Sequence, residues 1–500
     1  MLRWSSRSPP WIWWARIHYT EVADYLSAGE KIRAISDAGE FAALPMRELT
    51  PNSHGDWINQ RDDQFSTFPA IGDKRGEAAC TVFSSYSRGL ETGRDAWVYN
   101  FSKPKLSKNI RNTVEFFETV QRDYETWLRQ RGVTRNAPSR DEFVKQHSAS
   151  VNDPKKFSWT LSARNRLSSG TGMEFSASSI RRGTYRPFNT QWVYNHRSLN
   201  HIVGRLPSMF PTPHHTNIGF YVVGSGSEVP FSAIMLDLLP NLHVTGAGSG
   251  GQFFPRWTYE KAESEDGALD FASVDGGEVD EYGYRRLDNI TDAILMLYRG
   301  AVDDQVSKDD IFYYVYGLLH DPDYRATYAA DLKKMLPHIP TPENRERFEQ
   351  LAEAGRQLAD LHVNYETVQP YPLDVQLKAG ADPANRETWR VQKMKWAKKK
   401  DPATGKNIDD KTAIIYNPKV TIAGIPEAAE QYMLGSRSAL AWIIDRYQVK
   451  TDKASGIVND PNDWCDEHDE PTYIIDLIKK ITTVGMETVK IVDSLSRGSA

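Results

Sequence analysis

The chain has 500 residues, of which 40% are hydrophobic and 25% charged, and its formal net charge at pH 7 is −5. This length is more than one ordinary hydrophobic core fills, so we expect two or three domains. The charge excludes a globally basic nucleic-acid-binding protein, and no apolar run is long enough to span a membrane. We therefore expect a soluble protein with no membrane partner, in which any nucleic-acid surface is local.

The sequence contains two cysteines, Cys80 and Cys465. Neither has a Cys-x-x-Cys partner or a histidine at a zinc-binding spacing, so we expect no disulfide framework, no metal and a cytoplasmic location. Residues 1–15 hold four tryptophans without a helical or strand period, and they lack the apolar core of a signal peptide. We expect this atypical start to be unstructured.

Residues 16–103 alternate short strand-like runs with turns and are too few for a complete α/β domain. We expect them to be its trailing strands. A long amphipathic helix is predicted next, over 105–131, because apolar residues recur there at spacings of three and four. These residues are Leu106, Ile110, Val114, Phe117, Val120, Tyr124 and Trp127.

The remaining chain divides into three regions. Aromatic and β-branched residues broken by Gly, Pro, Ser and Asn predict a β-rich region over 157–260. A helical region follows over 288–365, and a hairpin with further helices is expected over 388–493. The predicted fold class is therefore α/β, with helices and strands mixed along the chain (mixed α+β). The expected helices are 309–319, 323–336, 343–363, 439–447 and 473–492, and the hairpin strands are 390–399 and 412–422.

The net charge conceals two opposite regions. Residues 155–210 hold nine Lys or Arg against one acid, Glu174, whereas residues 260–281 hold nine acids against one lysine, Lys261. Aromatic residues are interspersed with the basic ones, and this combination is typical of surfaces that bind phosphates and stack on bases. A twisted sheet with a solvated basic face remains the alternative.

A glycine-hinged loop, Gly89 to Trp97, joins a strand-like run to the predicted long helix. It places Thr92 and Arg94 where a loop can touch DNA. The alternative is a simple turn held by an ion pair between Arg94 and Asp95.

Two motifs suggest enzymes but lack the necessary context. Residues 246–251 match G-x-G-x-x-G, yet Pro255 blocks the helix that must follow, so we expect only a loop. Asp323, Asp331 and Lys333 have the order of a metal-dependent nuclease. On the predicted helix, Asp331 and Lys333 point to opposite faces, so we expect a solvated helix without a metal.

Three further segments resemble fragments of functional sites. Residues 416–419 approach the Asn-Pro-Pro-aromatic motif of adenine methyltransferases but lack its second proline and its aromatic ring, so we expect a turn. Residues 465–469 hold potential metal ligands, for which a solvated linker is the simpler explanation, and His214-His215 is expected in a loop. The sequence therefore predicts no catalytic residue and no metal site.

Several strings together resemble the carboxy-terminal part of the type ISP restriction-modification enzymes, which are single-polypeptide, Type I-like DNA translocases. The resemblance covers about residues 16–492. It rests on residues 50–61, 87–101, 185–188 with Tyr194, 246–257, 288–294, 310–320 and 442–452.

The resemblance implies the family order of nuclease, helicase-like motor, coupler, adenine-N6 methyltransferase and target-recognition domain. Residues 16–103 would then be the end of the methyltransferase and residues 104–495 the target-recognition (specificity) domain. S-adenosylmethionine, ATP and Mg belong to the intact family enzyme, and we expect no cofactor in this chain. We accordingly expect a fragment of a DNA methyltransferase and ATP-dependent endonuclease that is inactive alone.

We therefore predict a sequence-specific double-stranded DNA recognition module that directs adenine methylation and restriction in the intact enzyme. A scaffold that docks a separately encoded methyltransferase or helicase part is one alternative. A minimal DNA methyltransferase or nuclease is the other. The residues predicted to lie near DNA are Thr92, Arg94, Arg181, Arg182, Arg186, Arg197 and Lys450.

Overall fold

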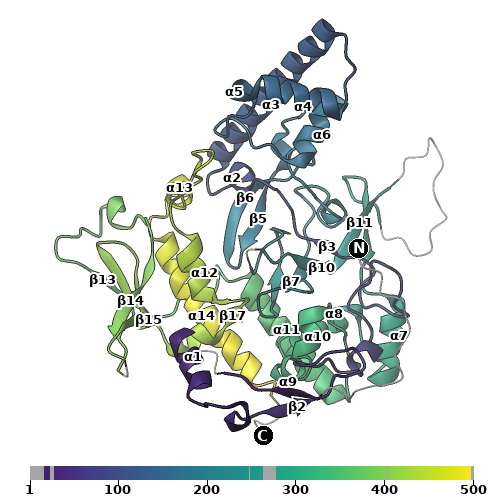
Figure 1. Cartoon of the computed structure of the whole chain (residues 1–500), viewed down its shortest axis with the longest axis vertical. Coiled ribbons are helices and arrows are strands. Elements are labelled where there is room, and N and C mark those ends of the chain that lie inside the picture. Colours follow the sequence, from purple (N-terminus) through teal and green to yellow (C-terminus); the bar gives the residue numbers. More distant parts are fainter. Residues whose placement is uncertain (1–15, 23–27, 247, 263–277, 403, 497–500) are drawn as a thin grey trace.

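The computed structural model describes residues 16–22, 28–246, 248–262, 278–402 and 404–496. The expected unstructured start at 1–15, most of the acidic run at 263–277, and Ala247 and Ala403 lie outside the described residues. Helices and several small sheets alternate along the chain (Figure 1). This confirms the expected mixed α/β class.

Two four-stranded sheets lie at the centre of the molecule. One has the order β3-β10-β7-β8 and the other β4-β6-β5-β9, and apart from the parallel pair β5 and β9 their neighbours are antiparallel. The strands are β3 (Ser87–Arg88), β4 (Tyr99–Asn100), β5 (Ile180–Arg186), β6 (Asn189–Tyr194), β7 (Gly219–Val223), β8 (Ala233–Leu236), β9 (Leu239–Pro240) and β10 (Gly251–Pro255). A two-stranded ribbon, β11 (Trp257–Lys261) and β12 (Tyr284–Asp288), follows.

A helical arm extends from the central sheets (Figure 1). Its main helix, α3 (Lys103–Arg131), confirms the predicted amphipathic helix and buries the predicted apolar stripe. Ser102 caps its first turn, and Gly132, with φ of 64°, ends it. The arm also holds α4 (Ala137–Gln146), α5 (Ser148–Val151) and α6 (Leu161–Ser169). Helix α6 lies in a region expected to be β-rich.

A second helical group packs against the sheet that contains β7 and β8. Helices α8 (Lys308–Leu318) and α11 (Arg345–Val363) approach closely, because a Cβ at Gly317 would lie 2.0 Å from the Leu351 carbonyl oxygen. The predicted helix over 323–336 is instead two short helices, because Tyr328 leaves helical geometry. The other helices here are α7 (Asp292–Ala301), α9 (Pro322–Thr327) and α10 (Ala329–Lys334).

The carboxy-terminal part confirms the predicted helices and the presence of a hairpin. The predicted strand over 412–422 is wrong, because the turn at 416–419 separates the strand Asn407–Ile415 from the strand Val420–Ala423. The hairpin belongs to a four-stranded sheet of order β13-β16-β15-β14, which projects to the left in Figure 1. Helix α14 (Tyr473–Asp493) packs against α11 and α12 (Ala439–Arg446). The remaining elements are β13 (Asp374–Leu377), β14 (Lys395–Lys400), β15 (Asn407–Ile415), β16 (Val420–Ala423), β17 (Met433–Leu434), β18 (Arg437–Ser438), β19 (Lys450–Thr451), β20 (Val458–Asn459) and α13 (Asn462–Glu467).

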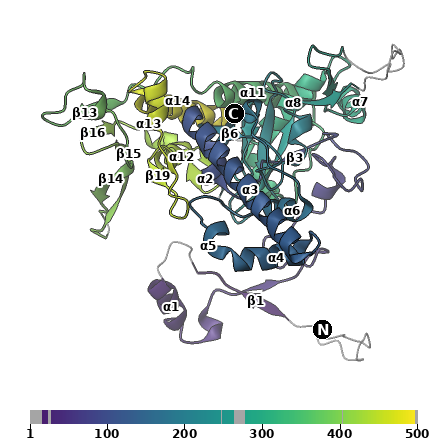
Figure 2. The same ribbon diagram turned by 90° about the horizontal axis from the view of Figure 1, so that it is seen from above.

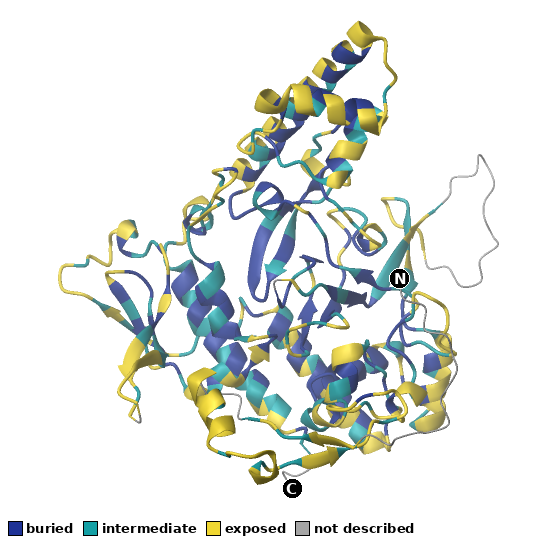
Figure 3. Ribbon diagram, viewed as in Figure 1, coloured by how far each residue is buried: buried dark blue, intermediate teal, exposed yellow. Residues whose placement is uncertain are grey.

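The first described residues form a small unit of β1 (Ile17–Tyr19), α1 (Ala28–Ser36) and β2 (Arg47–Leu49). This unit stands away from the sheets in Figure 2, and most of it is coloured as exposed in Figure 3. From Asp56 onward the chain joins the main body, because Asp56 forms an ion pair with Lys334 of α10. Strands β3 and β4 pair with β10 and β6, so the expected division at residue 103 does not coincide with a break in strand pairing.

The structure also corrects two expectations about the motifs. Asp331 is not on a solvated helix: it is 1% exposed and accepts a 3.1 Å hydrogen bond from the Asp62 backbone N–H. The segment expected to be a solvated linker at 465–469 is largely helix α13, in which Cys465 is buried. The carboxylate of Asp466 pairs there with Arg386 and Arg390.

The remaining motif expectations are confirmed. The described part of 246–251 is a loop that leads into β10 rather than a helix, and residues 416–419 turn between β15 and β16. His214 and His215 lie in a loop, where His215 contacts Asp280 at 2.8 Å. Within the described ranges, none of the helices is both long and apolar enough to cross a membrane.

Candidate nucleic-acid interface

The glycine-hinged loop is an ordered, hydrogen-bonded turn that leads into helix α2 (Asp95–Val98). Gly93 takes the positive φ of 66° that the turn requires. The Thr92 hydroxyl donates to the Asp95 carboxylate and accepts a 3.0 Å hydrogen bond from the Arg94 backbone N–H. Asp95 therefore pairs with Thr92, and the alternative of a turn held by an ion pair between Arg94 and Asp95 is wrong.

Arg94 points inward from this loop and is 5% exposed. Its Nη2 donates a 2.7 Å hydrogen bond to Thr160, and its guanidinium lies 5.0 Å from the Phe157 ring. Nε and Nη1 are buried without a hydrogen-bond partner in the described part of the chain, and burial lowers the pKa of Arg94 to about 10. The loop thus carries a buried positive charge, and the described residues provide no carboxylate that forms an ion pair with it.

A cationic cluster lies where β5 meets the carboxy-terminal segment. Three cations converge on Asp445: Arg437 at 2.6 Å, Arg446 at 2.8 Å and Lys450 at 3.7 Å. Arg186 lies 4.1 Å from the Tyr185 ring, and in addition to burial its charge lowers the pKa of both Arg446 and Lys450. We call Arg186, Arg437, Arg446 and Lys450 the cationic cluster.

The charges in this cluster perturb one another. Burial and then Arg446 lower the pKa of Lys450, while burial and then Arg186 lower the pKa of Arg446. Burial alone would raise the pKa of Asp445, but Arg446, Lys450 and Arg437 together lower it. One carboxylate is thus shared among several cations, so a further anion at this position would be stabilised.

The cationic cluster borders a cavity of about 240 Å³ between α2, β4 to β6 and the β19–β20 hairpin. Asn459 fixes that hairpin by donating a 2.9 Å hydrogen bond to Gln191 and accepting one of 3.0 Å from the Phe101 backbone N–H. The lining thus combines two cations with amide groups. Gln448 donates a 2.6 Å hydrogen bond to the Asp445 backbone carbonyl, which leaves its side-chain oxygen and its second N–H for the edge of a base. The polar and charged residues that line it are Asp95, Gln191, Arg446, Gln448, Lys450, Thr451, Asp452 and Asn459.

The two carboxylates at this cavity are already engaged by their own turns. Asp95 accepts from Thr92, and Asp452 accepts hydrogen bonds of 2.8 Å from both the backbone N–H and the hydroxyl of Ser455. Both carboxylates therefore keep their negative charge, while their oxygens accept hydrogen bonds within their own turns. Arg446 and Lys450 are the cations that face the space.

The predicted DNA-contact residues do not form one patch. Arg186 and Lys450 meet in the cationic cluster, and Thr92 lies beside Arg94 in the loop. Arg181 and Arg182 are consecutive on β5, so their side chains leave opposite faces. Thr92 and Arg186 are buried, and their direct contact with DNA stays a prediction.

The other predicted arginines have separate environments. Arg181 donates to the backbone carbonyls of Phe210 at 2.6 Å and Pro211 at 3.0 Å. Arg182 lies 4.2 Å from the Trp464 ring, while Arg197 is exposed in the loop after β6. These contacts explain why a sequence stretch rich in arginine does not become a continuous basic surface.

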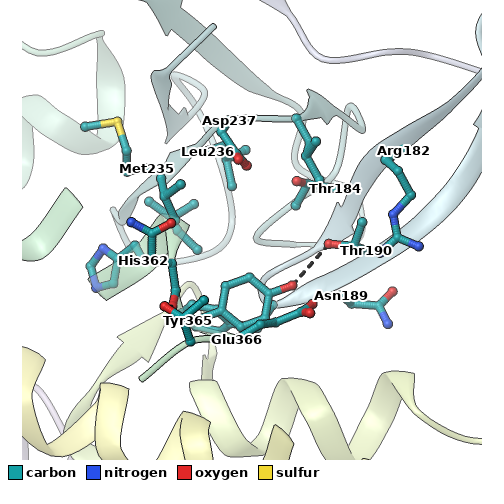
Figure 4. A pocket seen from close by; sticks show the side chains of 16 residues that line it. Arg182, Thr184, Asn189, Thr190, Met235, Leu236, Asp237, His362, Tyr365 and Glu366 are labelled. Carbon is teal, nitrogen blue, oxygen red and sulfur yellow. Dashed lines mark hydrogen bonds between the residues drawn. The ribbon is translucent and has the colours of Figure 1, made fainter. Parts of the chain in front are cut away.

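A second cavity, of about 210 Å³, lies between β5, β8 and the end of α11 (Figure 4). Thr190 and Tyr365 are joined there by a 3.1 Å hydrogen bond. Arg182 lines it together with the carboxylates of Asp237 and Glu366, and burial and then Glu366 raise the pKa of Asp237. Its two acids make this cavity a poor site for phosphate.

Two features of the described residues bear on metal and nucleotide binding. They contain no group of three or more His, Cys, Asp or Glu that could hold a metal ion. The glycine-rich segment at 246–251 precedes a strand and so lacks the helix N-terminus that holds a nucleotide phosphate. The residues present do not fit S-adenosylmethionine or ATP at this segment.

Sequence reasoning missed Arg446, Gln448, Gln191 and Asn459. Arg446 and Gln448 lie in residues 442–452, a string that carried the family resemblance. The hairpin of β19 and β20 has only two residues in each strand, which is too short for a period. Its polar side chains line the cavity only because the hairpin contacts residues that are far away in the sequence.

Comparison with known families matches residues 81–477 to the Type ISP C-terminal specificity domain. The chain belongs to this family. The resemblance found in the sequence is thereby confirmed. The matched range includes the glycine-hinged loop, the cationic cluster and every strand of the two central sheets.

Three solved structures are similar to this specificity-domain chain. A nuclease-deletion mutant of the Type ISP restriction-modification enzyme LlaGI, in complex with a DNA substrate mimic, is 33% identical with a TM-score of 0.74, over 96% of this chain and 39% of that chain. The ATP-dependent Type ISP enzyme LlaBIII bound to DNA is 29% identical with a TM-score of 0.73, over 96% and 28%. A DrdV–DNA complex is 26% identical with a TM-score of 0.72, over 97% and 44%.

This specificity-domain chain therefore spans less than half the length of each of the three similar chains. No curated protein matches it.

Proposed function

We propose that the chain is a target-recognition module that binds double-stranded DNA in a sequence-specific manner. The observation that carries this proposal is the cationic cluster, in which several cations share one carboxylate beside an amide-lined cavity. The family membership and the DNA in the three similar complexes support it. In the proposal, Arg446 and Lys450 bind phosphate and Gln448 reads a base edge.

The test is DNA binding by the purified 500-residue chain. Lys450→Gln should weaken binding to all duplexes about equally and reduce the slope of log K against log salt by about one, because one phosphate contact is lost. Lys453→Gln is the matched control, since Lys453 is an exposed lysine in the same hairpin but outside the cavity lining. Absence of DNA binding by the unaltered chain would refute the proposal.

We further propose that recognition by this module directs adenine methylation and restriction when the module is part of an intact enzyme of its family, with S-adenosylmethionine, ATP and Mg bound outside this chain. The support is the family membership. A type ISP methyltransferase lacking its own specificity domain should regain site-specific methylation when joined to this chain. Methylation without site preference would contradict the proposal.

A specific observation favours a docking role as a second function. The unit of β1, α1 and β2 exposes Ile32 at 65%, Ile35 at 53% and Phe41 at 63%. Exposed apolar side chains concentrated in one small unit are typical of an interaction surface. The proposed partner is a methyltransferase or helicase part, and Ile32→Asp should weaken its co-purification without changing DNA affinity.

The free cysteines and the proposed DNA target are compatible with the cytoplasm.

A further inference from the structure

The β14–β15 ribbon is the most lysine-rich part of the chain. Residues 390–419 hold nine Lys or Arg against three acids, all of them aspartates. Six of the lysines lie on the ribbon and its turn, and none of them lies within the 155–210 region that sequence analysis singled out. These six are Lys395, Lys398, Lys399, Lys400, Lys406 and Lys411.

The base of the ribbon is rigidly held while its far half is exposed. Trp396 is 7% exposed and lies beneath Lys411, whose Nζ is 4.4 Å from the ring. Asn417 donates hydrogen bonds of 3.0 Å to the backbone carbonyls of Thr388 and Arg390 and so fixes the turn after β15. Beyond Trp396, both strands carry mostly exposed residues, and Figure 1 shows the hairpin projecting from the body. Its charged end is therefore presented on a firm support.

The lysines of the ribbon outnumber their intramolecular partners. Lys398 pairs with Asp409 at 2.5 Å and Lys399 with Asp410 at 3.6 Å. For Lys395, Lys400 and Lys406, no carboxylate in the described part of the chain lies within ion-pairing distance. All three are exposed, so three positive charges remain available for an external anion.

The shape of the ribbon fits duplex DNA. Six residues of β14 extend roughly 20 Å, and a two-stranded ribbon is one of the elements that a major groove can admit. Neighbouring lysines such as Lys398 and Lys399 leave opposite faces of the strand, so cations face both sides of the ribbon. Such an arrangement can contact phosphates on both walls of a groove. In Figure 2 the ribbon points to the same side of the molecule as the β19–β20 hairpin.

We propose that the β14–β15 ribbon is a second, sequence-independent DNA-binding element that contacts backbone phosphates outside the recognition cavity. This inference rests on the proposed DNA-recognition function and adds a separate surface to it. The ribbon supplies affinity and extends the footprint, whereas the cavity supplies base discrimination.

A different role would explain the same lysines. β14 is an edge strand of its sheet, and lysines on an edge strand discourage pairing with other chains. That role does not require Lys406, which lies in the turn rather than on the open edge. The two roles also differ in what they predict for loss of the lysines: the DNA-binding role predicts weaker DNA binding, and edge protection predicts unchanged DNA binding.

The test is the triple variant Lys395→Gln, Lys400→Gln, Lys406→Gln in the full chain, with the triple Lys→Arg variant as a charge-matched control. We expect the Gln variant to bind DNA about 10- to 100-fold more weakly at low salt, with the salt slope reduced by about 2 to 3. Its preference for target over non-target duplex should be unchanged. The Arg variant should keep the affinity and slope of the unaltered chain, and a hydroxyl-radical footprint should lose its flanking protection only in the Gln variant.

Two results would overturn the inference while leaving the recognition function intact. One is a Gln variant with unaltered affinity and salt slope. The other is a Gln variant that self-associates without weaker DNA binding, as edge protection predicts. Failure of the unaltered chain to bind any duplex would instead refute the recognition function, so the two failures are distinguishable.

Discussion

Arg94 and Thr160 are joined by a 2.7 Å hydrogen bond that ties the loop before α2 to the start of α6. Thr160 also caps α6, because its hydroxyl accepts from the Ala163 backbone N–H. One hydroxyl thus serves a helix end and a buried guanidinium. The central sheets and the helical arm are held together at this point.

Thr160→Ala should destabilise the chain more when Arg94 is present than when it is absent. In the unaltered chain, the substitution removes the cap and leaves the buried guanidinium without its hydrogen bond, for about 2 to 3 kcal/mol in total. In an Arg94→Met background it should cost about 1 kcal/mol, because only the cap is lost. Urea unfolding of the four proteins in the double-mutant cycle measures the difference. Equal costs in both backgrounds would show that the two residues are not coupled.

Gly317→Ala should severely destabilise the pairing of α8 and α11. The added Cβ would lie 2.0 Å from the Leu351 carbonyl oxygen, so the backbones would have to separate. We expect a loss of at least about 3 kcal/mol in unfolding free energy, or failure to fold. Gly300→Ala on α7 is the control, since nothing lies within 4 Å of its Cβ position, and it should stabilise by about 0.5 to 1 kcal/mol. Thermal unfolding compares the two variants.

Stability should fall on acidification partly because of His362. Its ring contacts the Tyr316 hydroxyl at 2.6 Å and the Thr488 hydroxyl at 3.0 Å, and burial lowers its pKa to about 3. Between pH 3 and about 6.5 the unfolded chain binds this proton and the folded chain does not, so stability decreases as pH falls.

From pH 7.5 to 5.5 the contribution of His362 amounts to about 1.4 kcal/mol. His362→Gln should lower stability at pH 7.5 but remove this part of the pH dependence, as measured by urea unfolding at both pH values. His147→Gln, which alters an exposed histidine of the arm, should leave the dependence unchanged. A variant at His362 that retains the full acid sensitivity would exclude this explanation.

Gln448→Ala should reduce discrimination at one base pair by about 1 to 3 kcal/mol, because the amide can pair with the edge of an adenine. The salt slope should not change, since no charge is removed. Competition between target and singly substituted duplexes is the measurement. Gln376→Ala on β13, outside the cavity, should alter neither quantity. A uniform loss of affinity for all duplexes would assign Gln448 to the framework instead.

Long helices were predictable from the sequence because their apolar residues follow a helical period. The expected bounds of α3, α11 and α14 differ from the observed ones by at most two residues at each end. Helix α6 was missed because it is short and the surrounding aromatic and β-branched residues favoured strands.

Strand partners were much less predictable. β3 and β4 have two residues each, so neither carries a pattern that identifies its partner. The candidate site has the same limitation: Arg186 and Lys450 were predicted separately, but their common environment depends on tertiary packing. The solvent exposure of individual arginines could not be predicted from the sequence either, since Arg94 is buried and Arg197 is exposed.

Residues 56–102 pack against elements that come much later in the sequence. These contacts determine where the specificity domain can be exchanged between enzymes. Phe65 is fully buried, Asp56 is paired to α10, and the Ile71 backbone N–H donates to the Pro337 carbonyl at 2.9 Å. A chimera joined at residue 103 would take β3 and β4 from one parent enzyme and their partner strands β10 and β6 from the other. A joint placed between Leu49 and Asp56 would transfer both central sheets whole, so that breakpoint is the one to use for transplanting a new target preference.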